Sequence, residues 1–527
     1  MNDPTVHEVP EPTTEKADFR SQVGNISSQS GVFFAGTIFT AAVGYVFKVY
    51  LARTLGAEAL GIYALGMTVV GLMGVFGGLG LTWAASRFPA AYCATGRTEE
   101  LRSFLSWSVL SLLVVNGLFA LGVVLARQWI SIRLYHTPAL GGYLHLFAMI
   151  MFLGALTTFF GQLLAGYKEV ARRTLIVNVG SVVLTAVFTV VLVGRGAGLW
   201  GYIFAQVASG VVVLIMVVAV AIRLTPRVAR SLWRGVHSPP REMFSFAFAA
   251  LAMDIVGFLY TQTDKVILGF YLDARSVGIY AVAATVVAFL PIALQSVNQI
   301  FSPTIADLHT RGESAGLNRL FQILTKWVLG LTVPLAAVVV IFSPVLMRVF
   351  GHDFDAGWGL LVIGTVGQLV NCGVGSVGYL LLMSGNERRL VRIQLAMAVL
   401  TVTSCLLLVP RWGVAGAAVA AALGNAGTNA WCLWEVKRTL GLFPYNRGYA
   451  KLVLPTITAL AAAIGLRVAL RPVRQDLLVI AAAMLAVYLV FLGTVWLSGL
   501  EEDDRLLVSA AWSRVRGLVF RAQAGAA

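Results

Sequence analysis

The sequence predicts an all-α integral membrane protein with 14 transmembrane helices, arranged as two pseudo-symmetric six-helix lobes plus two extra C-terminal helices. Composition, the spacing of apolar runs and an internal repeat lead to this prediction. Of the 527 residues, 58% are hydrophobic and only 12% are charged, whereas about 25% of the residues of a typical soluble domain are charged. The chain therefore has the composition of a membrane protein.

Apolar runs define the predicted spans, because about 20 consecutive apolar residues cross a bilayer as a helix. Fourteen runs have this character. They lie near residues 30–51, 61–84, 104–126, 143–166, 174–193, 199–222, 243–269, 277–301, 327–347, 357–383, 391–409, 413–436, 452–470 and 477–498.

An internal repeat relates two halves of the chain. Residues 48–70 align without a gap to residues 265–287, a shift of 217, and 12 of the 23 aligned positions are identical. The match includes Lys48 with Lys265 and the block Gly-Ile-Tyr-Ala, which begins at Gly61 and again at Gly278. Internal repeats of this kind are typical of transporters, whose substrate sites lie where the repeats meet.

The repeat continues beyond this block, so spans 1–6 pair with spans 7–12, and spans 13 and 14 have no counterpart. Six is an even number, so the halves share one orientation, about an axis along the membrane normal. The predicted organisation is a disordered cytoplasmic tail (1–29), an N-lobe (30–222), a basic cytoplasmic linker (223–242), a C-lobe (243–436), spans 13 and 14 (452–498) and a cytoplasmic tail (499–527). Residues 505–521 of that tail suit either an interfacial helix or a loosely ordered segment.

The net charge of +15 is explained by topology rather than by nucleic-acid binding. Most lysines and arginines fall on loops that share one side with the N-terminus, above all on the linker from Arg223 to Arg241. Positive residues concentrate on the cytoplasmic side of membrane proteins. We therefore expect both termini in the cytoplasm of a multi-pass protein of the bacterial inner (plasma) membrane.

Neither a metal site nor a disulfide framework is expected. The four cysteines lack metal-ligand spacing, and three of them lie in predicted spans. His352 with Asp353 and Asp355 suits a cation, although a solvated loop explains these residues more simply. We expect no cofactor and no catalytic residues.

Charged residues within the predicted spans carry most of the functional information, since each costs about 2.5–3.5 kcal/mol at the centre of a membrane helix. Span 7 contains Asp254, Gln262, Asp264 and Lys265. The matching lysine of span 1 is Lys48. Two interpretations remain open: the lysines extend to the membrane interface, or they face a shared central cavity and bind an anion such as a phosphate.

Polar residues of other spans have two interpretations as well. They line the same cavity, or they form hydrogen bonds between helices. These residues are Gln295, Asn298, Gln299, Gln368, Asn371, Asn425 and Asn429.

Several motifs resemble those of the polysaccharide flippases (O-antigen and exopolysaccharide, Wzx-type) of the MOP superfamily. They are the turn Arg53–Tyr63, Gly78-Leu-Gly80 late in span 2, Asp264–Gly269 at the end of span 7 and the Gly-rich entry to span 12. The resemblance covers about residues 25–500. It implies two lobes that face each other across a cavity lined mainly by spans 1, 2, 7 and 8.

The resemblance also implies a function without enzymatic catalysis. We expect transfer of an undecaprenyl-diphosphate-linked oligosaccharide from the inner to the outer leaflet by alternating access, with polymerase and glycosyltransferase partners. In this hypothesis Lys48, Lys265 and Arg87 bind the substrate, whereas Asp254, Asp264 and Gln262 couple or tune the cycle. The alternatives are a MATE-like cation-coupled exporter of drugs or metabolites, or a membrane polysaccharide polymerase or ligase.

Overall fold

The computed structural model describes residues 12–226, 241–471 and 475–499, and these residues form helices and turns without any strand. The chain divides into two compact units. Unit 1 contains Met1–Leu55 and Gly66–Phe258, and unit 2 contains Gly56–Leu65 and Leu259–Ala527. The predicted all-α class is confirmed within the described residues. The lobe boundaries drawn from the repeat stay a prediction, and the unit boundary at Phe258 lies inside a helix.

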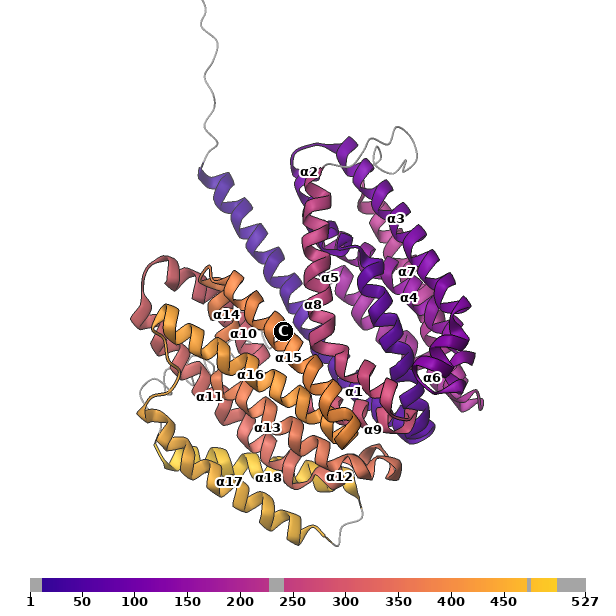
Figure 1. The fold of residues 1–527 in the computed structure, drawn as a ribbon. Coiled ribbons are helices and arrows are strands. Elements are labelled where there is room, and N and C mark those ends of the chain that lie inside the picture. The colour runs from indigo at the N-terminus through magenta and orange to yellow at the C-terminus, as the bar shows by residue number, and fades with distance from the viewer. Residues whose placement is uncertain (1–11, 227–240, 472–474, 500–527) are drawn as a thin grey trace, which may run out of the picture. The chain divides into compact units, whose positions relative to one another are not determined.

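Helices α1–α7 come from the first half of the chain, and α8 passes from unit 1 into unit 2 (Figure 1). Their bounds are α1 (Pro12–Gly78), α2 (Leu81–Ala94), α3 (Thr98–Leu125), η1 (Trp129–Leu134), η2 (Pro138–Gly142), α4 (Leu144–Gly166), α5 (Val170–Arg173), η3 (Thr174–Gly180), α6 (Ser181–Gly194), α7 (Gly198–Leu224) and α8 (Arg241–Tyr271).

The remaining helices belong to unit 2. Their bounds are α9 (Ala274–Val287), α10 (Ile292–Thr310), α11 (Ser314–Ile341), α12 (Ser343–Phe350), η5 (His352–Gly357), α13 (Trp358–Val374), α14 (Val377–Met383), α15 (Glu387–Trp412), α16 (Val414–Leu440), η6 (Arg447–Tyr449), α17 (Ala450–Ala469) and α18 (Asp476–Leu497).

Within the described residues, 11 helices are long and apolar enough to span a membrane, or 12 if one bent pair is a single span. The predicted count of 14 is therefore not confirmed. The first two predicted spans lie in one segment, Ala35–Ala94, and α16 does not qualify because Asn425, Asn429 and Glu435 reduce its apolar character. The eighth predicted span is bent by 51° between α9 and α10, where Pro291 cannot donate a helical hydrogen bond.

Helix α1 contains a break at Gly56, whose φ of 79° and ψ of 176° are not helical. Glycine adopts a positive φ without the steric penalty of a side chain. The break lies in the turn that the sequence places between spans 1 and 2. Residues 56–65, which follow it, pack within unit 2 although they come from the first half of the chain.

Helix α1 begins at Pro12, so residues 12–29, which the sequence places in a disordered tail, are helical here. Proline suits the first turn of a helix because its nitrogen needs no hydrogen-bond partner there. Residues 1–11 of that tail, residues 227–240 of the basic linker and residues 500–527, with the candidate interfacial helix, lie outside the described residues.

The two C-terminal helices α17 and α18 pack against each other and against α11 (Figure 1). Ala459, Ala463, Ala483 and Val487 are fully buried in this contact. The hydroxyl of Tyr488 on α18 donates to the backbone oxygen of Leu331 on α11 at 2.8 Å. These two helices therefore form an additional layer of unit 2.

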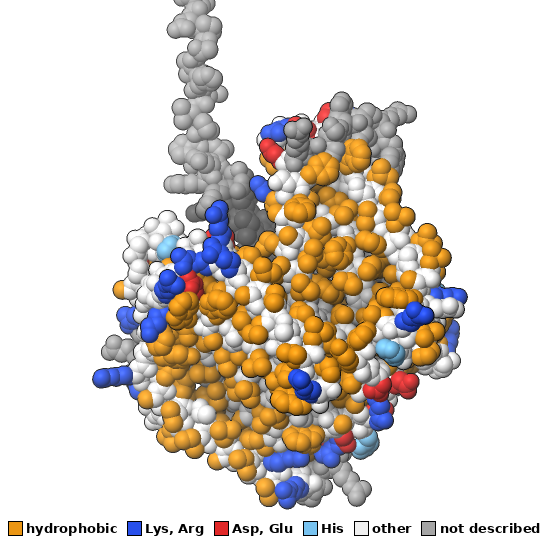
Figure 2. Space-filling view, viewed as in Figure 1, with side chains coloured by type: hydrophobic (Ala, Val, Ile, Leu, Met, Phe, Trp, Pro, Cys, Tyr) orange, Lys and Arg blue, Asp and Glu red, His pale blue; other side chains and the backbone are white. Residues whose placement is uncertain are grey.

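Hydrophobic side chains are spread over the visible helical surface (Figure 2). Leu125, Phe248 and Leu497 are each at least 75% exposed. A soluble monomer seldom exposes apolar side chains on such a scale. The exposed apolar surface, together with the long apolar helices, identifies a multi-pass membrane protein.

Candidate functional site

Helix α8 carries four of the six residues that the sequence predicts as functional. It is continuous from Arg241 to Tyr271, without an internal proline. The unit boundary after Phe258 divides these residues: Asp254 belongs to unit 1, whereas Gln262, Asp264 and Lys265 belong to unit 2.

Asp264 is the centre of the polar cluster in unit 2. The backbone N–H of Lys265 donates to Asp264 Oδ1 at 2.8 Å, and the hydroxyl of Tyr280 donates to Asp264 Oδ2. Tyr280 is 4% exposed and lies on α9. The short turn after Tyr271 returns the chain, so that α9 brings this hydroxyl to a carboxylate 16 residues earlier in the sequence.

The ammonium of Lys265 donates to Gln262 Oε1 at 2.8 Å, one helical turn earlier. Both side chains are only partly exposed. The Lys265 side chain thus bonds to a neutral amide rather than to the carboxylate of the adjacent Asp264. The hydrogen-bond partner of the Lys265 ammonium is therefore a neutral side chain of the same helix.

A cavity of ≈ 180 Å³ lies beside Asp264 in unit 2. Its polar lining consists of Asp264, Tyr280, Gln368 and Asn425, and small residues of α9, α13 and α16 form most of the remainder. Neither Lys48 nor Lys265 lines this cavity, so whether the polar span residues share a cavity with the lysines stays a prediction. Gln368 and Asn425 line this cavity, and Asn425 also donates to the backbone oxygen of Gly367 on α13 at 3.4 Å.

Asp254 lies in unit 1, where its Oδ1 accepts a hydrogen bond of 3.1 Å from Nε1 of Trp83 on α2. Arg87, one turn further along α2, is exposed, and its guanidinium lies 4.9 Å from the centre of the Phe246 ring on α8. Helices α2 and α8 therefore bring Asp254 and Arg87 to one face of unit 1. Lys48 also belongs to unit 1, on α1, and is partly exposed. That Lys48 and Lys265 share one cavity stays a prediction.

Several polar groups were missed by the sequence analysis. Tyr280 and Trp83 acquire their carboxylate partners only through contacts between helices, so no spacing within one helix reveals them. Lys326 is 7% exposed within α11, although the sequence places it just before a span. In the sequence, its burial was indicated only by its position directly before the apolar run that begins at residue 327.

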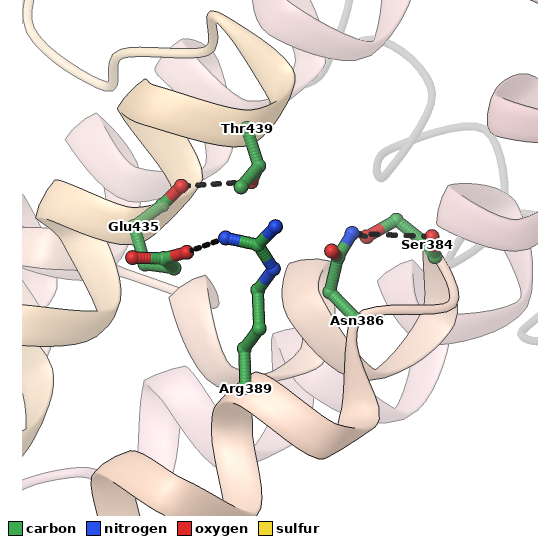
Figure 3. A network of polar contacts seen from close by, with 5 residues as sticks. All are labelled: Ser384, Asn386, Arg389, Glu435 and Thr439. Carbon is green, nitrogen blue, oxygen red and sulfur yellow. Dashed lines mark hydrogen bonds and ion pairs between the residues drawn. The ribbon is translucent and has the colours of Figure 1, made fainter.

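An ion pair on unit 2 was missed as well (Figure 3). The guanidinium of Arg389 on α15 contacts the carboxylate of Glu435 on α16, whose side chain is 8% exposed. Thr439 donates to the backbone oxygen of Glu435 at 2.7 Å. The pair joins two helices whose sequence separation is 46 residues, and we assign it a structural role.

The described residues contain no group of three or more potential metal ligands. His352 is 93% exposed and lies 3.7 Å from Asp355, whereas Asp353 pairs with Arg275 instead. The four cysteines are free, and only Cys93 is exposed. The loop at His352 is thus a solvated segment held by an ion pair.

Comparison with known proteins identifies the family to which the sequence belongs. A model of the family described as "Polysaccharide biosynthesis protein" matches residues 28–309. The probable low-salt glycan biosynthesis flippase Agl15 of Haloferax volcanii is 23% identical over 412 residues, which cover 76% of this chain and 81% of that protein.

Two solved structures share the fold. The lipid II flippase MurJ in an inward closed conformation has a TM-score of 0.67 at 14% identity, covering 88% of this chain and 97% of that chain. An inward-facing multidrug resistance MATE family transporter of the MOP superfamily has a TM-score of 0.59 at 14% identity, covering 76% of this chain and 94% of that chain. The fold is thus that of MOP-superfamily flippases and transporters, and the chain belongs to the polysaccharide biosynthesis protein family.

Proposed function

We propose that this protein translocates a lipid-diphosphate-linked oligosaccharide from the inner to the outer leaflet by alternating access, during the biosynthesis of a cell-surface polysaccharide. The observation that carries the proposal is Lys265, a partly buried cation on a membrane helix of a polysaccharide biosynthesis protein, with its ammonium 2.8 Å from Gln262. An ammonium is a compact donor to phosphate oxygens. The relationship to a glycan biosynthesis flippase supports the same function.

The proposed substrate is the undecaprenyl-diphosphate-linked oligosaccharide expected from the sequence. In this proposal Lys48 and Lys265 bind the diphosphate or an anionic sugar, and Arg87 attracts the head group from the cytoplasmic side. The prenyl chain stays in the lipid. In this proposal the protein lies in the bacterial inner membrane with both termini in the cytoplasm. Glycosyltransferases supply the substrate and a polymerase consumes it.

Asp264 is the proposed coupling group, and Gln262 orients Lys265 beside it. Two hydrogen-bond donors hold the carboxylate of Asp264 at the edge of a cavity. In this proposal the carboxylate exchanges a cation with water while the cavity is open, and the exchange stops when Tyr280 and the cavity wall close around it. Translocation coupled to an ion gradient needs such an exchangeable group.

The test is the leaflet distribution of lipid-linked oligosaccharide in the native host after depletion of the protein. We expect complete units to accumulate on the cytoplasmic face while surface polysaccharide is lost. Units that reach the outer face but stay unpolymerised would contradict the proposal and favour an assembly enzyme. Drug hypersensitivity with normal polysaccharide would favour an exporter.

Complementation of the depleted strain tests the site. The variant Lys48→Glu/Lys265→Glu reverses both charges, so we expect loss of transport with normal membrane insertion. Lys168→Glu/Lys437→Glu makes the same charge change at exposed positions and is the matched control. Normal transport by the first variant would refute the role of the two lysines.

A further inference from the structure

We propose that Trp83 and Asp254 form a sugar-binding subsite, in which the indole ring stacks on a pyranose and the carboxylate accepts hydrogen bonds from its hydroxyl groups. This inference rests on the proposed function and names the part of the substrate that these residues bind. It also changes the expected role of Asp254 from coupling to recognition. The argument depends on where the carboxylate lies, what it contacts and how it is held.

Asp254 lies deep within a membrane helix. It follows Arg241 by 13 residues and precedes Tyr271 by 17, which places it ~20 Å from one end of α8 and ~25 Å from the other at 1.5 Å per residue. A lysine at a helix end extends to the interface, but an aspartate at this depth is too short to do so. A carboxylate facing hydrocarbon at mid-membrane is costly. The partly exposed Asp254 therefore faces a wet surface rather than lipid.

The Trp83 side chain shares this surface. Its Nε1 donates to Asp254 Oδ1 at 3.1 Å, so the ring edge is fixed while 53% of the residue stays exposed. The indole N–H has its acceptor in this carboxylate, and the apolar faces of the ring are left uncovered. An ionised carboxylate has about four acceptor sites, and Trp83 uses one of them.

The backbone holds the two helices close together at this point. Gly80, at the start of α2, has a φ of 66°, and a Cβ there would lie 1.9 Å from the backbone oxygen of Ala247 on α8. No larger residue fits this contact. The position of Trp83 relative to Asp254 is therefore set by backbone packing, which lowers the entropy lost when a ligand binds.

The combination of groups matches a sugar linked to a phosphate. The carbon–hydrogen face of a pyranose is apolar and packs on an aromatic ring, whereas its hydroxyl groups need acceptors. Arg87 is four residues after Trp83 on the same helix, so it lies ~6 Å further along the axis. A guanidinium there attracts the anionic part of the substrate and disfavours an organic cation, which an isolated aromatic–carboxylate pair would otherwise accept.

The experiment measures binding to the purified full-length protein by native mass spectrometry. The two probes are undecaprenyl diphosphate and the lipid-linked oligosaccharide fraction extracted from the native host. We expect wild-type protein to bind the oligosaccharide-linked lipid more tightly than the bare diphosphate. Trp83→Ala should weaken binding of the oligosaccharide-linked lipid by about tenfold or more and leave binding of undecaprenyl diphosphate within about twofold.

Further variants separate recognition from folding. Trp83→Phe keeps an aromatic face, so it should recover part of the lost affinity, and Asp254→Asn should reduce affinity for the oligosaccharide-linked lipid alone. Trp496→Ala removes a tryptophan that is 74% exposed on α18 and should change neither affinity. An equal loss for both probes in Trp83→Ala, or no loss for either, would overturn the subsite.

Failure of the proposed function has a different signature. If wild-type protein binds neither probe, the flippase assignment itself fails, and the subsite fails with it. If wild-type protein binds both probes equally, the flippase assignment stands and the subsite is rejected. Preferential binding of an organic cation, tested with tetraphenylphosphonium, that is lost in both Trp83→Ala and Asp254→Asn would also reject it.

Discussion

The two copies of the repeated segment, residues 48–70 and 265–287, share a backbone contact but differ in their polar groups. The contact is reciprocal. A Cβ on Gly61 would lie 1.6 Å from the backbone oxygen of Ala274, and a Cβ on Gly278 would lie 2.0 Å from that of Ala57. Each residue is 217 positions from its counterpart in the other copy. The small residues of the repeat therefore let the two copies cross each other in close contact. This crossing lies within unit 2.

The residues just before each lysine, in contrast, differ between the two halves of the chain. Position 264 is an aspartate that accepts a hydrogen bond from Tyr280, whereas the corresponding position in the first copy is Phe47, which packs on Tyr50 and Tyr202. Likewise Gln262, the partner of Lys265, corresponds to Tyr45. The repeat thus retains a packing surface and one lysine per copy, and the groups around each lysine have diverged.

The largest expected effect concerns the crossing. Glycine to alanine within a helix normally stabilises by about 0.5–1 kcal/mol, but Gly61→Ala and Gly278→Ala should each destabilise by about 3 kcal/mol, because the new methyl group would overlap a backbone oxygen. Thermal unfolding of the purified protein measures this.

Gly74→Ala is the matched control for the crossing, since nothing lies within 4 Å of a Cβ at Gly74 on the same helix. It should unfold at or above the wild-type temperature. If Gly61→Ala and Gly278→Ala behave like the control, the reciprocal contact does not stabilise the protein.

A smaller effect is expected from the polar difference between the copies. Tyr280→Phe removes the hydroxyl that donates to Asp264 and leaves a carboxylate oxygen without that donor. It should lower the free energy of unfolding by about 1–3 kcal/mol. In the proposed mechanism, transport then loses its dependence on the ion gradient. Tyr271→Phe changes an exposed tyrosine and is the control. An unchanged gradient dependence in Tyr280→Phe would argue against coupling through Asp264.

Gln262→Leu tests whether the two lysines differ. It should lower the free energy of unfolding by about 1 kcal/mol, because the ammonium of Lys265 loses an acceptor at 2.8 Å but can reorient towards water. We expect weaker binding of undecaprenyl diphosphate, measured by native mass spectrometry. Tyr45→Leu makes the corresponding change near Lys48. Equal effects would indicate that the two lysines still act alike despite their different neighbours.

The smallest effect is expected at the start of α9, in the middle of the second copy. Arg275 corresponds to Glu58 in the first copy and contacts Asp353 at 3.3 Å, with both side chains more than half exposed. Exposed ion pairs contribute about 0–1 kcal/mol. Arg275→Ala should therefore lower the unfolding temperature only slightly, and less at high salt. A loss as large as that of Gly278→Ala would show that this ion pair supports the crossing.

The sequence by itself determined the class of the protein and the location of its unusual charges. Long apolar runs, the 217-residue shift and the polar residues of span 7 are local or periodic features, so they can be recognised without knowing which helices contact each other. The MOP-superfamily resemblance followed from the same short segments. The count of spans among the described residues differs from the predicted 14, because the break at Gly56 and the bend at Pro291 alter how apolar runs divide into helices.

Only the tertiary structure decided which groups meet. The partners of Asp264 and Asp254 are a tyrosine 16 residues away and a tryptophan 171 residues away, on other helices. The burial of Lys326 and the pairing of Arg389 with Glu435 likewise depend on how helices cross. Helical periodicity fixes which residues share a face, but a neighbouring helix decides what that face touches, and that choice is made by packing over the whole unit.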